Sequence, residues 1–315
     1  MRIAILDDYQ AVALKLADWS GLRAHCDIDV FTAPIPEANA ASVLAPYDIL
    51  CTLRERMQIG GDLIRALPKL KYIVVTGKRY DAIDVAAARA CGVPVSNTDV
   101  RGGGGVAELA WGLILSCARR IAYEDRMMRE GGWQNSIGIT LRGRNLGLVG
   151  FGNLGRQMAH IGRAFGMNIL AWSPNLTPER AEAGGATYAS KEELLRQSDI
   201  VSLHLVLGAT TRGIIGAENQ NMMKPGAYLI NTARGALVDE SALLDALRNK
   251  TIAGAGLDVF DQEPLDDNHP LRSLENVVLT PHLGYYTQEM VATYYEDAIK
   301  AIKAFVEGAP IRLVN

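Results

Sequence analysis

Three segments in the second half of the sequence carry polar side chains directly after apolar runs. They read INTARGALVDE, GLDVFDQEPL and LTPHLG, and they contain Arg234, Glu263 and His282 respectively. The planar fork of an arginine binds a carboxylate with two parallel hydrogen bonds, and a histidine gains or loses a proton near neutral pH. Together they could bind an acidic substrate and transfer one proton. Taken singly, each has an ordinary explanation: a structural ion pair, a loop acid, and a buried or surface histidine at a strand end.

A glycine-rich stretch indicates a second kind of chemistry. GFGNLG places glycines at positions 150, 152 and 155, the G-x-G-x-x-G spacing that binds the pyrophosphate of a dinucleotide at a helix N-terminus. The context fits, because LGLV and NILAW are typical of strands and NLGRQMAHIGRAF between them has helical spacing. A second match, GGGGVA over Gly102–Ala107, precedes a helix with no second strand at the right distance. The sequence therefore predicts the dinucleotide site at Gly150.

The residue at the end of the second of these strands bears on which dinucleotide binds. A carboxylate there, about 20 residues after the first glycine, hydrogen-bonds the adenosine ribose and repels a 2′-phosphate. This sequence has Ser173 instead, followed by Pro174, and the nearest downstream arginine is Arg180. A serine can donate a hydrogen bond to either group, so the sequence allows NAD or NADP and slightly favours NADP. In the alternative interpretation, Ser173 is only a turn residue before Pro174.

These residues need a scaffold that brings strand ends together, and the apolar runs indicate one. Runs of strand length alternate with helix-length segments along the chain, which is typical of parallel strands covered on both faces. The carboxyl ends of parallel strands share one edge of the sheet, where ligands bind. The predicted strands lie at residues 2–7, 47–52, 71–77, 145–152, 168–173, 199–205, 227–233, 251–259 and 276–282.

Two long amphipathic segments indicate the domain organisation. Residues 106–133 have apolar positions at helical spacing up to Gly131 and Gly132, and we predict one long helix there at a domain boundary. Residues 288–308 predict another helix, which returns the chain to the N-terminal sheet. We therefore expect residues 1–98 and 286–315 to form a smaller domain, with a larger dinucleotide-binding domain, residues 99–285, inserted between them.

Composition argues against several classes of protein. With 49% hydrophobic and 21% charged residues in 315, the chain can bury a large core. The net charge of −3 comes from interspersed charges, so we expect no nucleic-acid partner. No apolar run reaches the length of a membrane span, and the first residues lack the apolar core of a signal peptide, so we expect a cytoplasmic protein without membrane contact. The four scattered cysteines are expected to be buried thiols, and no metal site is predicted.

Four motifs in one order carry a family resemblance. GLVGFGNLG, INTARG, GLDVFDQEP and TPHLG resemble those of the D-isomer-specific 2-hydroxyacid dehydrogenases, the family of phosphoglycerate and glyoxylate/hydroxypyruvate reductases. The resemblance extends over essentially the whole chain, from LPKLKYIVVTGKRYDAIDVAAA through VAELAWGLIL to the C-terminal helix. It implies an α/β fold of two doubly wound parallel-sheet domains, a Rossmann dinucleotide-binding domain inserted in a smaller flavodoxin-like substrate domain. It also implies a homodimer, formed through AWGLILSCARRIAYEDRMMREGGW.

The resemblance gives each residue of the polar set a role. His282 resembles the family's acid/base, which gives a proton to the keto oxygen as hydride arrives from the nicotinamide. Glu263 resembles the carboxylate that holds the imidazole and raises its pKa from about 6.5. Arg234 resembles the residue that binds the substrate carboxylate and polarises the carbonyl. These roles agree with the chemistry, because hydride transfer leaves a developing alkoxide that a cation and an acid stabilise.

Other positions resemble the family's binding residues. Asp258 resembles the ligand to the nicotinamide carboxamide, and Arg54 matches a position that can face the substrate. Gly77 belongs to the loop whose backbone N–H groups bind the substrate carboxylate, but Lys78 and Arg79 replace small residues common there, which suggests a more anionic substrate. Each basic side chain, taken alone, is also compatible with solvated surface. The other cofactor-lining positions are Gly150, Gly152, Asn153, Leu154, Gly155, Ser173, Val206, Thr232, Ala233 and Gly284.

The sequence thus predicts an NAD(P)-dependent enzyme that transfers a hydride between a nicotinamide and C2 of a small 2-hydroxy or 2-oxo acid. Two alternatives share the fold. A transcriptional corepressor would bind the dinucleotide as a signal without turnover. A formate dehydrogenase would not need His282 to carry a proton for a hydroxyl. The complete arginine, glutamate and histidine set favours the hydroxyacid chemistry.

Overall fold

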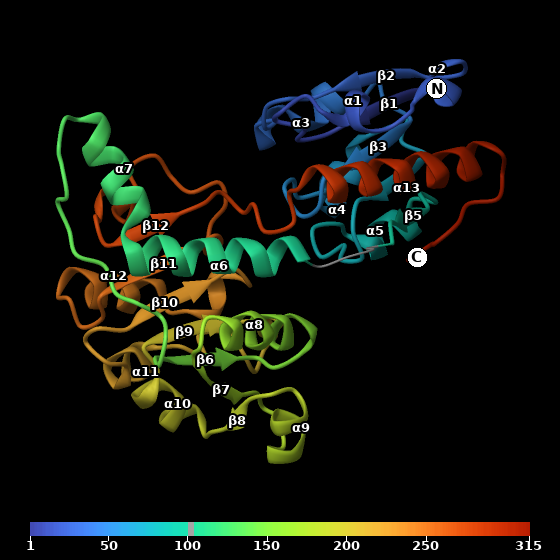
Figure 1. Ribbon diagram of the computed structural model, residues 1–315. Coiled ribbons are helices and arrows are strands. Elements are labelled where there is room, and N and C mark those ends of the chain that lie inside the picture. The colour runs from blue at the N-terminus through green and yellow to red at the C-terminus, as the bar shows by residue number, and fades with distance from the viewer. Residues whose placement is uncertain (100–103) are drawn as a thin grey trace. The chain divides into compact units, whose positions relative to one another are not determined.

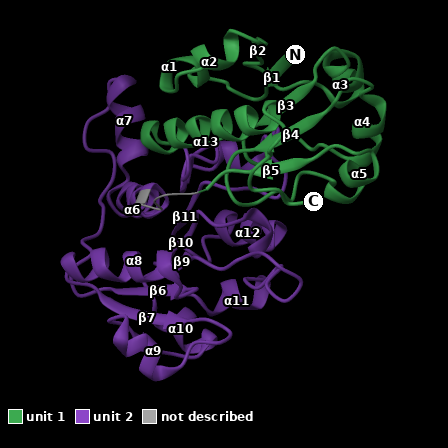
Figure 2. Cartoon of the chain, turned by 90° about the vertical axis from the view of Figure 1, so that its right-hand side faces the viewer, with its two compact units in different colours: residues 1–102, 287–315 green, residues 103–286 purple. Residues whose placement is uncertain are grey.

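The computed structural model describes residues 1–99 and 104–315. Contacts divide the chain into two compact units (Figure 2): unit 1 is Met1–Gly102 with Thr287–Asn315, and unit 2 is Gly103–Tyr286. The expected boundaries, after residues 98 and 285, lie within a few residues of these. The first two glycines of GGGGVA, at positions 102 and 103, lie outside the described residues.

Unit 1 is a parallel α/β structure (Figure 1). Its strands are β1 Arg2–Ile5, β2 Asp27–Val30, β3 Ile49–Thr52, β4 Tyr72–Val75 and β5 Val95–Asn97, and its helices are α1 Ala13–Leu16, α2 Ser20–Arg23, α3 Glu37–Leu44, α4 Gly61–Ala66, α5 Val85–Ala90 and α13 Gln288–Val306. The described strands form one sheet in the order β2-β1-β3-β4-β5. This is the flavodoxin-like order, in which the strand order reverses between β1 and β3.

The core of unit 1 forms on both faces of this sheet. Every residue of β3 and β4 is buried, as expected for central parallel strands covered by helices. Tyr72 of β4 stacks on Phe305 of α13, with ring centroids 4.3 Å apart. The predicted C-terminal helix is therefore confirmed, and it packs on the N-terminal sheet. Among the described residues, no helix is long and apolar enough to cross a membrane.

Unit 2 contains a second, larger parallel sheet. Its strands are β6 Asn145–Val149, β7 Asn168–Trp172, β8 Thr187–Tyr188, β9 Ile200–Leu203, β10 Tyr228–Asn231, β11 Gly254–Leu257 and β12 Val277–Leu279, and its helices are α6 Gly104–Arg119, α7 Ile121–Arg129, α8 Asn153–Ala164, α9 Pro178–Ala183, α10 Lys191–Gln197, α11 Ala217–Met222 and α12 Glu240–Arg248, with short 3-10 helices η1 Gly235–Leu237 and η2 Pro270–Ser273. The described strands run in the order β12-β11-β10-β9-β6-β7-β8. The order reverses between β6 and β9, as in a Rossmann domain.

Alternating side chains of these strands fill two cores on opposite faces of the sheet. Leu146 and Leu148 of β6 pack in one core with residues of α6 and α8, including Met158. Val149 of β6 and Val201 of β9 belong to the other core, which residues of α10 and α12 complete. Successive side chains of a strand point to opposite faces, so a continuous apolar run serves both cores. Because helices cover both faces of the sheet, the ends of its strands are the parts that remain accessible.

All nine predicted strands are confirmed, and the structure adds β2, β5 and β8, which the sequence did not predict. Each of these three lies at an edge of its sheet. β2 carries two aspartates and has no buried residue, whereas β5 and β8 are only three and two residues long. An edge strand pairs on one side only and packs less apolar surface, so it leaves a weaker pattern in the sequence.

The predicted single helix over residues 106–133 is wrong, because the structure has two helices there. α6 ends at Arg119 and α7 begins at Ile121; Arg120 between them has a left-handed backbone with φ 52°. Its guanidinium carbon lies 4.3 Å from the centre of the Tyr123 ring. A left-handed residue interrupts the helical hydrogen bonds although the apolar spacing continues. The expectation of four buried cysteines is also wrong, since Cys91 is exposed at the end of α5.

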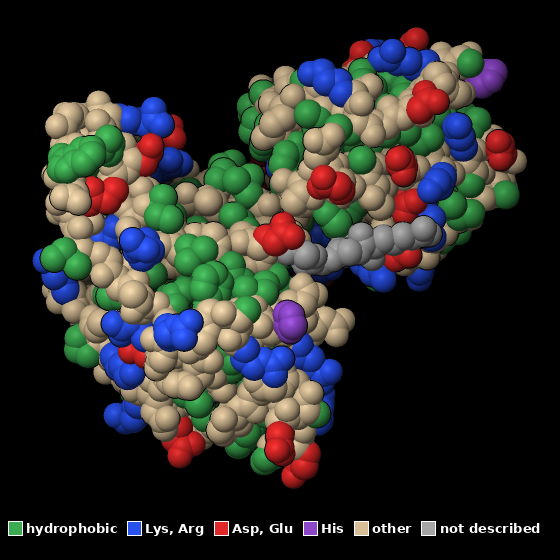
Figure 3. All heavy atoms as spheres, in the orientation of Figure 1, with side chains coloured by type: hydrophobic (Ala, Val, Ile, Leu, Met, Phe, Trp, Pro, Cys, Tyr) green, Lys and Arg blue, Asp and Glu red, His purple; other side chains and the backbone are tan. Residues whose placement is uncertain are grey.

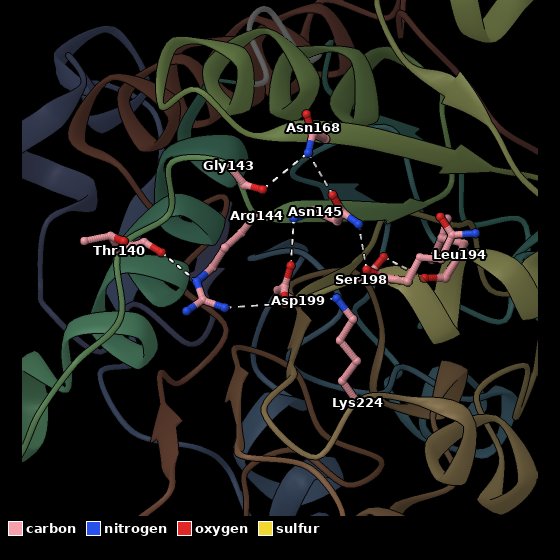
Figure 4. A network of polar contacts seen from close by, with 10 residues as sticks. Thr140, Gly143, Arg144, Asn145, Asn168, Leu194, Ser198, Asp199 and Lys224 are labelled. Carbon is pink, nitrogen blue, oxygen red and sulfur yellow. Dashed lines mark hydrogen bonds and ion pairs between the residues drawn. The ribbon is translucent and has the colours of Figure 1, made fainter.

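A charged cluster at the amino ends of the unit 2 strands has a structural role (Figure 4). Asp199, just before β9, accepts the backbone N–H of Asn145 at 2.9 Å. Arg144 and Lys224 also contact its carboxylate, at 3.4 and 3.1 Å. Burial raises the pKa of Asp199, but the backbone hydrogen bond and the two cations lower it overall. The cluster ties neighbouring strands together at the edge opposite to the one where open α/β sheets bind ligands.

Candidate active site

The three glycines of GFGNLG differ in what surrounds them. Gly150 follows β6 with φ +107°, and a Cβ there would lie 2.5 Å from the carbonyl carbon of His204. A Cβ at Gly155 would collide with the carbonyl oxygen of Gly150. At Gly152, in contrast, a Cβ would meet nothing within 4 Å. The first and third glycines are therefore required by packing within the protein, whereas the second borders open space that a ligand can approach.

Helix α8 begins directly after this open position. Gly152 caps the helix without a side-chain hydrogen bond, and no acidic residue lies in the first turn, which starts with Asn153 and Leu154. The first N–H groups of a helix have no partner within the helix and carry its positive dipole end. The turn and the helix therefore fit the pyrophosphate of a dinucleotide.

Ser173 lies beside this turn at the carboxyl end of β7. Its Oγ accepts a hydrogen bond from the backbone N–H of Phe151 at 2.8 Å. This contact holds the strand end against the glycine turn, and it leaves the hydroxyl proton of Ser173 for donation to another group. Arg180 lies in the following helix α9, and its Nη1 donates to the carbonyl oxygen of Asn175 at 2.9 Å.

The loop after β10 is closed by a residue that the sequence analysis did not single out. The side chain of Asn231 donates to the carbonyl oxygen of Arg234 at 2.9 Å and accepts the N–H of Ala233 at 3.0 Å. Within the described chain, the buried Oγ1 of Thr232 has no hydrogen-bond partner. On the loop after β9, Val206 is 68% exposed. An asparagine that ends an apolar strand and precedes a polar loop was the available signal for this turn.

Arg234 is brought close to the loop after β11 by its neighbour Gly235. A Cβ at Gly235 would collide with the backbone of Phe260, so the two loops are in direct backbone contact. The half-buried Arg234 side chain donates from Nη1 to the carbonyl oxygen of Ala233 at 2.7 Å. Its positive charge also acts on Glu263, where it contributes to a lower pKa.

His282 and Glu263 form a direct pair at the same edge of the sheet. Nδ1 of His282 lies 2.6 Å from Oε2 of Glu263, and the backbone N–H of Phe260 donates to Oε1 at 2.9 Å. Burial raises the pKa of Glu263, but its contacts with His282 and Phe260 and the charge of Arg234 lower it overall. The carboxylate is therefore held in its ionised form against the imidazole.

Two other histidines of unit 2, His269 and His204, are placed differently. His269 lies 3.1 Å from Glu240 through Nε2, and its Nδ1 accepts the N–H of Leu271 at 3.3 Å and caps η2, so both ring nitrogens have structural partners. Burial lowers the pKa of His204 to about 4, which keeps that imidazole neutral. Nε2 of His282, in contrast, makes no hydrogen bond to any residue that the structure describes. His282 is thus oriented by a carboxylate and retains one ring nitrogen for chemistry.

Asp258 holds the loop that carries His282. Its carboxylate accepts hydrogen bonds from the Thr280 hydroxyl at 2.6 Å and from the N–H groups of Leu283 and Gly284 at 2.7 and 2.9 Å. The side chain is fully buried, and burial raises its pKa despite these hydrogen bonds and the nearby His282 charge. The carboxylate thus binds its own chain, and the contact with the nicotinamide that the resemblance implies for Asp258 stays a prediction. The carboxylate stabilises a turn in which His282 has a left-handed φ of 55°.

The basic residues singled out in unit 1 lie beside carboxylates. Arg54 follows β3 and lies 3.7 Å from Glu55, and a Cβ at Gly77 would collide with its guanidinium. Lys78 pairs with Asp99 at 3.2 Å and Arg79 with Asp81 at 3.0 Å. Lys78 and Arg79 thus each pair with an aspartate, and the suggestion of a more anionic substrate stays a prediction.

The fold and the site together define a class of protein. A Rossmann unit with an open glycine turn, and an oriented histidine at the carboxyl ends of its strands, is the arrangement of a nicotinamide-dinucleotide-dependent oxidoreductase. The family model described as D-isomer specific 2-hydroxyacid dehydrogenase, NAD binding domain, matches residues 111–284. The chain belongs to the D-isomer-specific 2-hydroxyacid dehydrogenase family and is an enzyme of that class.

Individual relatives agree with this assignment. A glyoxylate reductase from Aeropyrum pernix is 40% identical over 306 residues, which cover 93% of this chain and 91% of that protein. A hydroxypyruvate reductase from Blautia hydrogenotrophica is 31% identical over 325 residues and covers 100% of both chains. The crystal structure of a phosphoglycerate oxidoreductase from Vibrio cholerae has a TM-score of 0.92 and 35% identity, covering 98% of this chain and 100% of that chain. The predicted family and fold class are thus confirmed.

Proposed function

We propose that this chain transfers a hydride between a nicotinamide dinucleotide and C2 of a small 2-oxo or 2-hydroxy acid, with His282 as the acid/base. One observation carries the proposal. Nδ1 of His282 is held by Glu263 at 2.6 Å, while Nε2 bonds to no residue in the described part of the chain. An oriented imidazole with one available nitrogen can give a proton to a carbonyl oxygen or take it back.

Three side chains divide the work of reduction. A bound reduced dinucleotide would supply the hydride to C2. Arg234 binds the substrate carboxylate and polarises the carbonyl with its planar fork. As negative charge develops on the carbonyl oxygen, His282 donates its Nε2 proton to that oxygen, which becomes the hydroxyl. Glu263 stabilises the imidazolium before this transfer, and in the direction of oxidation the same nitrogen accepts the proton.

The glycine turn is the proposed dinucleotide site. The open space at Gly152 and the uncapped start of α8 support a pyrophosphate there. Ser173 is placed beside the turn by its contact with Phe151, which supports a role toward the adenosine ribose. Val206, Thr232, Ala233 and Gly284 lie in loops after β9, β10 and β12 at the same edge of the sheet, where they are proposed to line the rest of the cofactor.

A substrate screen tests the proposal. Glyoxylate, hydroxypyruvate and longer 2-oxo acids are offered with NADH and with NADPH, and D- and L-2-hydroxy acids are then offered with the oxidised cofactors. We expect turnover of at least one 2-oxo acid and of one hydroxyacid enantiomer. Dinucleotide binding without turnover would favour a sensor, and oxidation of formate would favour the other enzyme of this fold.

Replacing Glu263 with Gln should move the alkaline limit of 2-oxo acid reduction to lower pH, because the proton-donating imidazolium loses its carboxylate partner. The pKa of Glu263 is lower in the folded protein than its ordinary value of 4.5. The Glu263–His282 pair therefore stabilises the folded state above pH 4.5, and this stabilisation is lost as the pH falls through the lowered pKa. The measurement is kcat against pH. Glu275→Gln, which removes a carboxylate 3.5 Å from Arg126 on the surface, is the control. Superimposable profiles for wild type and Glu263→Gln would contradict the pairing.

Introducing a carboxylate with Ser173→Asp should raise the ratio of kcat/KM for NADH over NADPH by about tenfold or more. Aspartate can still accept the Phe151 N–H, and it adds a charge that binds ribose hydroxyls and repels a 2′-phosphate. Wild type should use NADPH at least comparably to NADH. Ser173→Asn, which has the same shape without the charge, is the control. Strong rejection of NADPH by wild type, or an unmoved ratio in Ser173→Asp, would place Ser173 away from the ribose.

We also propose that the chain forms a homodimer through α7 and the loop that follows it. None of the α7 residues is buried. Ile121, Met128, Trp133 and Ile137, on the helix and the loop, are 54%, 53%, 74% and 96% exposed. Large apolar side chains exposed on a helix and the adjoining loop favour contact with another chain. Light scattering of the purified protein should give twice the mass of 34.1 kDa, and a monomer would contradict the proposal.

A further inference from the structure

His204 lies at the point where the strand order of the unit 2 sheet reverses. It follows β9 directly, and its backbone N–H donates to the carbonyl oxygen of Val149, the last residue of β6, at 2.7 Å. A Cβ at Gly150 would lie 2.5 Å from the carbonyl carbon of His204. His204 is therefore in backbone contact with the first glycine of the proposed pyrophosphate turn, at the point where open α/β sheets bind ligands.

The imidazole of His204 has no hydrogen-bond partner in the part of the chain that the structure describes. Nδ1 and Nε2 are both buried, yet neither forms a hydrogen bond. Burial keeps the ring neutral by lowering its pKa to about 4, so the ring holds one N–H donor and one acceptor nitrogen. Buried polar atoms without partners destabilise the folded state. A ligand that supplied these hydrogen bonds would remove the destabilisation.

The other four histidines of the chain are not in this position. Two of them pair with glutamates, as described above, and His25 and His160 are exposed. Figure 3 shows histidine side chains at the surface in purple, where water can hydrogen-bond the ring nitrogens. Among the described residues, His204 is thus the only histidine whose two ring nitrogens are both buried and unpaired.

Thr232 carries a second unpaired group on the adjacent strand. It follows β10 as His204 follows β9, and the two strands pair in register up to Asn231 and Leu203, the residues just before them. Thr232 is 7% exposed, and its buried Oγ1 has no partner among the described residues. A hydroxyl, like a neutral imidazole, both donates and accepts a hydrogen bond. Two such groups at matching positions of adjacent strands fit ligand hydroxyls, which also do both.

The strand order indicates which part of a dinucleotide lies at this position. Ser173, proposed for the adenosine ribose, follows β7, and the glycine turn, proposed for the pyrophosphate, follows β6. β9 and β10 come next in the sheet (Figure 1), and Glu263 and His282 follow β11 and β12 beyond them. In a nicotinamide dinucleotide, the group between the pyrophosphate and the nicotinamide is the second ribose, which carries two hydroxyls. The ends of β9 and β10 therefore correspond to that ribose.

We propose that the His204 imidazole and the Thr232 hydroxyl bind the hydroxyls of the nicotinamide-side ribose. The inference rests on the proposed dinucleotide site, and it adds His204, to which the sequence assigned no role. The His204 ring turns about its Cβ–Cγ bond, a rotation with broad energy wells, and so brings a nitrogen to the ligand. Its hydrogen bonds form only in the loaded protein. His204 therefore lowers the stability of the free protein and raises its affinity for the dinucleotide.

The test compares ADP-ribose with ADP, which lacks the second ribose. Wild type should bind ADP-ribose more tightly, as measured by titration calorimetry. His204→Leu and Thr232→Val replace each polar group by an apolar side chain of similar volume, and each should weaken ADP-ribose binding about tenfold while ADP binding stays unchanged. His204→Leu should also raise the melting temperature of the nucleotide-free protein by about 2–4 °C, because it removes two buried unpaired nitrogens.

His160→Leu is the matched control, because it makes the same substitution at an exposed position of α8. It should change neither the melting temperature nor the two affinities. An unchanged ratio of ADP-ribose to ADP affinity in His204→Leu, or a lower melting temperature, would overturn the inference, since the imidazole would then have a purely structural role. Thr232→Val gives the same affinity comparison independently, should His204→Leu fold poorly.

These binding measurements need no 2-oxo acid, so they separate the inference from the proposed reaction. Absence of turnover with every 2-oxo acid, together with the expected affinities, would overturn the proposed function alone. Equal affinity of wild type for ADP-ribose and ADP would overturn the inference alone. Failure of wild type to bind either nucleotide would overturn the proposed dinucleotide site and this inference together.

Discussion

Replacing His282 with asparagine should lower kcat for 2-oxo acid reduction by about 100-fold or more while the dinucleotide still binds. The variant removes the Nε2 proton that the mechanism gives to the carbonyl oxygen. Asparagine is the appropriate replacement because His282 has a left-handed φ of 55°, which asparagine tolerates better than alanine. Steady-state kinetics gives kcat, and quenching of protein fluorescence by the dinucleotide gives its dissociation constant.

The second histidine–carboxylate pair of unit 2 supplies the control. His269→Asn removes an imidazole that lies 3.1 Å from Glu240, and asparagine can still cap η2. Near-normal turnover is expected for this variant, since both ring nitrogens of His269 have structural partners. Unchanged turnover in His282→Asn would remove His282 from the mechanism. Loss of dinucleotide binding there would show that the substitution damages more than proton transfer.

The central strands were predictable because their residues serve two cores at once. β3 and β4 are buried at every position, and this leaves a continuous apolar run in the sequence. The edge strand β2 has no such run, because it pairs with a neighbouring strand on one side only and none of its residues is buried. The break between α6 and α7 was not predictable either. A left-handed arginine at position 120 has no local signal of the kind that glycine provides.

The residues of the site could be predicted from the sequence, but the contacts among them could not. Motif spacing placed Arg234, Glu263 and His282 at strand ends, and parallel strands put those ends at one edge. The contacts that fix them depend on neighbours distant in sequence, as when the Asp258 carboxylate binds the loop of Leu283 and Gly284. The sequence also showed basic residues at positions 78 and 79 without showing that Asp99 and Asp81 balance them. Charge balance is a property of tertiary contacts.

Arg234→Lys should lower kcat/KM for 2-oxo acids by about 100-fold or more, although it keeps the positive charge. Nη1 of Arg234 donates to the Ala233 carbonyl oxygen at 2.7 Å, which fixes the orientation of the planar group. A lysine has one nitrogen in place of this fork, so it cannot hold that carbonyl and bind a carboxylate with two parallel hydrogen bonds at the same time.

The location of Arg234 makes the experiment specific. Gly235 holds this loop against the backbone of Phe260, and Asn231 closes it from the other side, so the loop should keep its shape in the variant. Thermal unfolding and dinucleotide affinity are therefore expected to stay near wild type while kcat/KM falls. Arg126→Lys, at the surface 3.5 Å from Glu275, is the matched control and should be neutral. A kcat/KM near wild type in Arg234→Lys would mean that the charge alone suffices, and the proposed grip on the substrate carboxylate would be wrong.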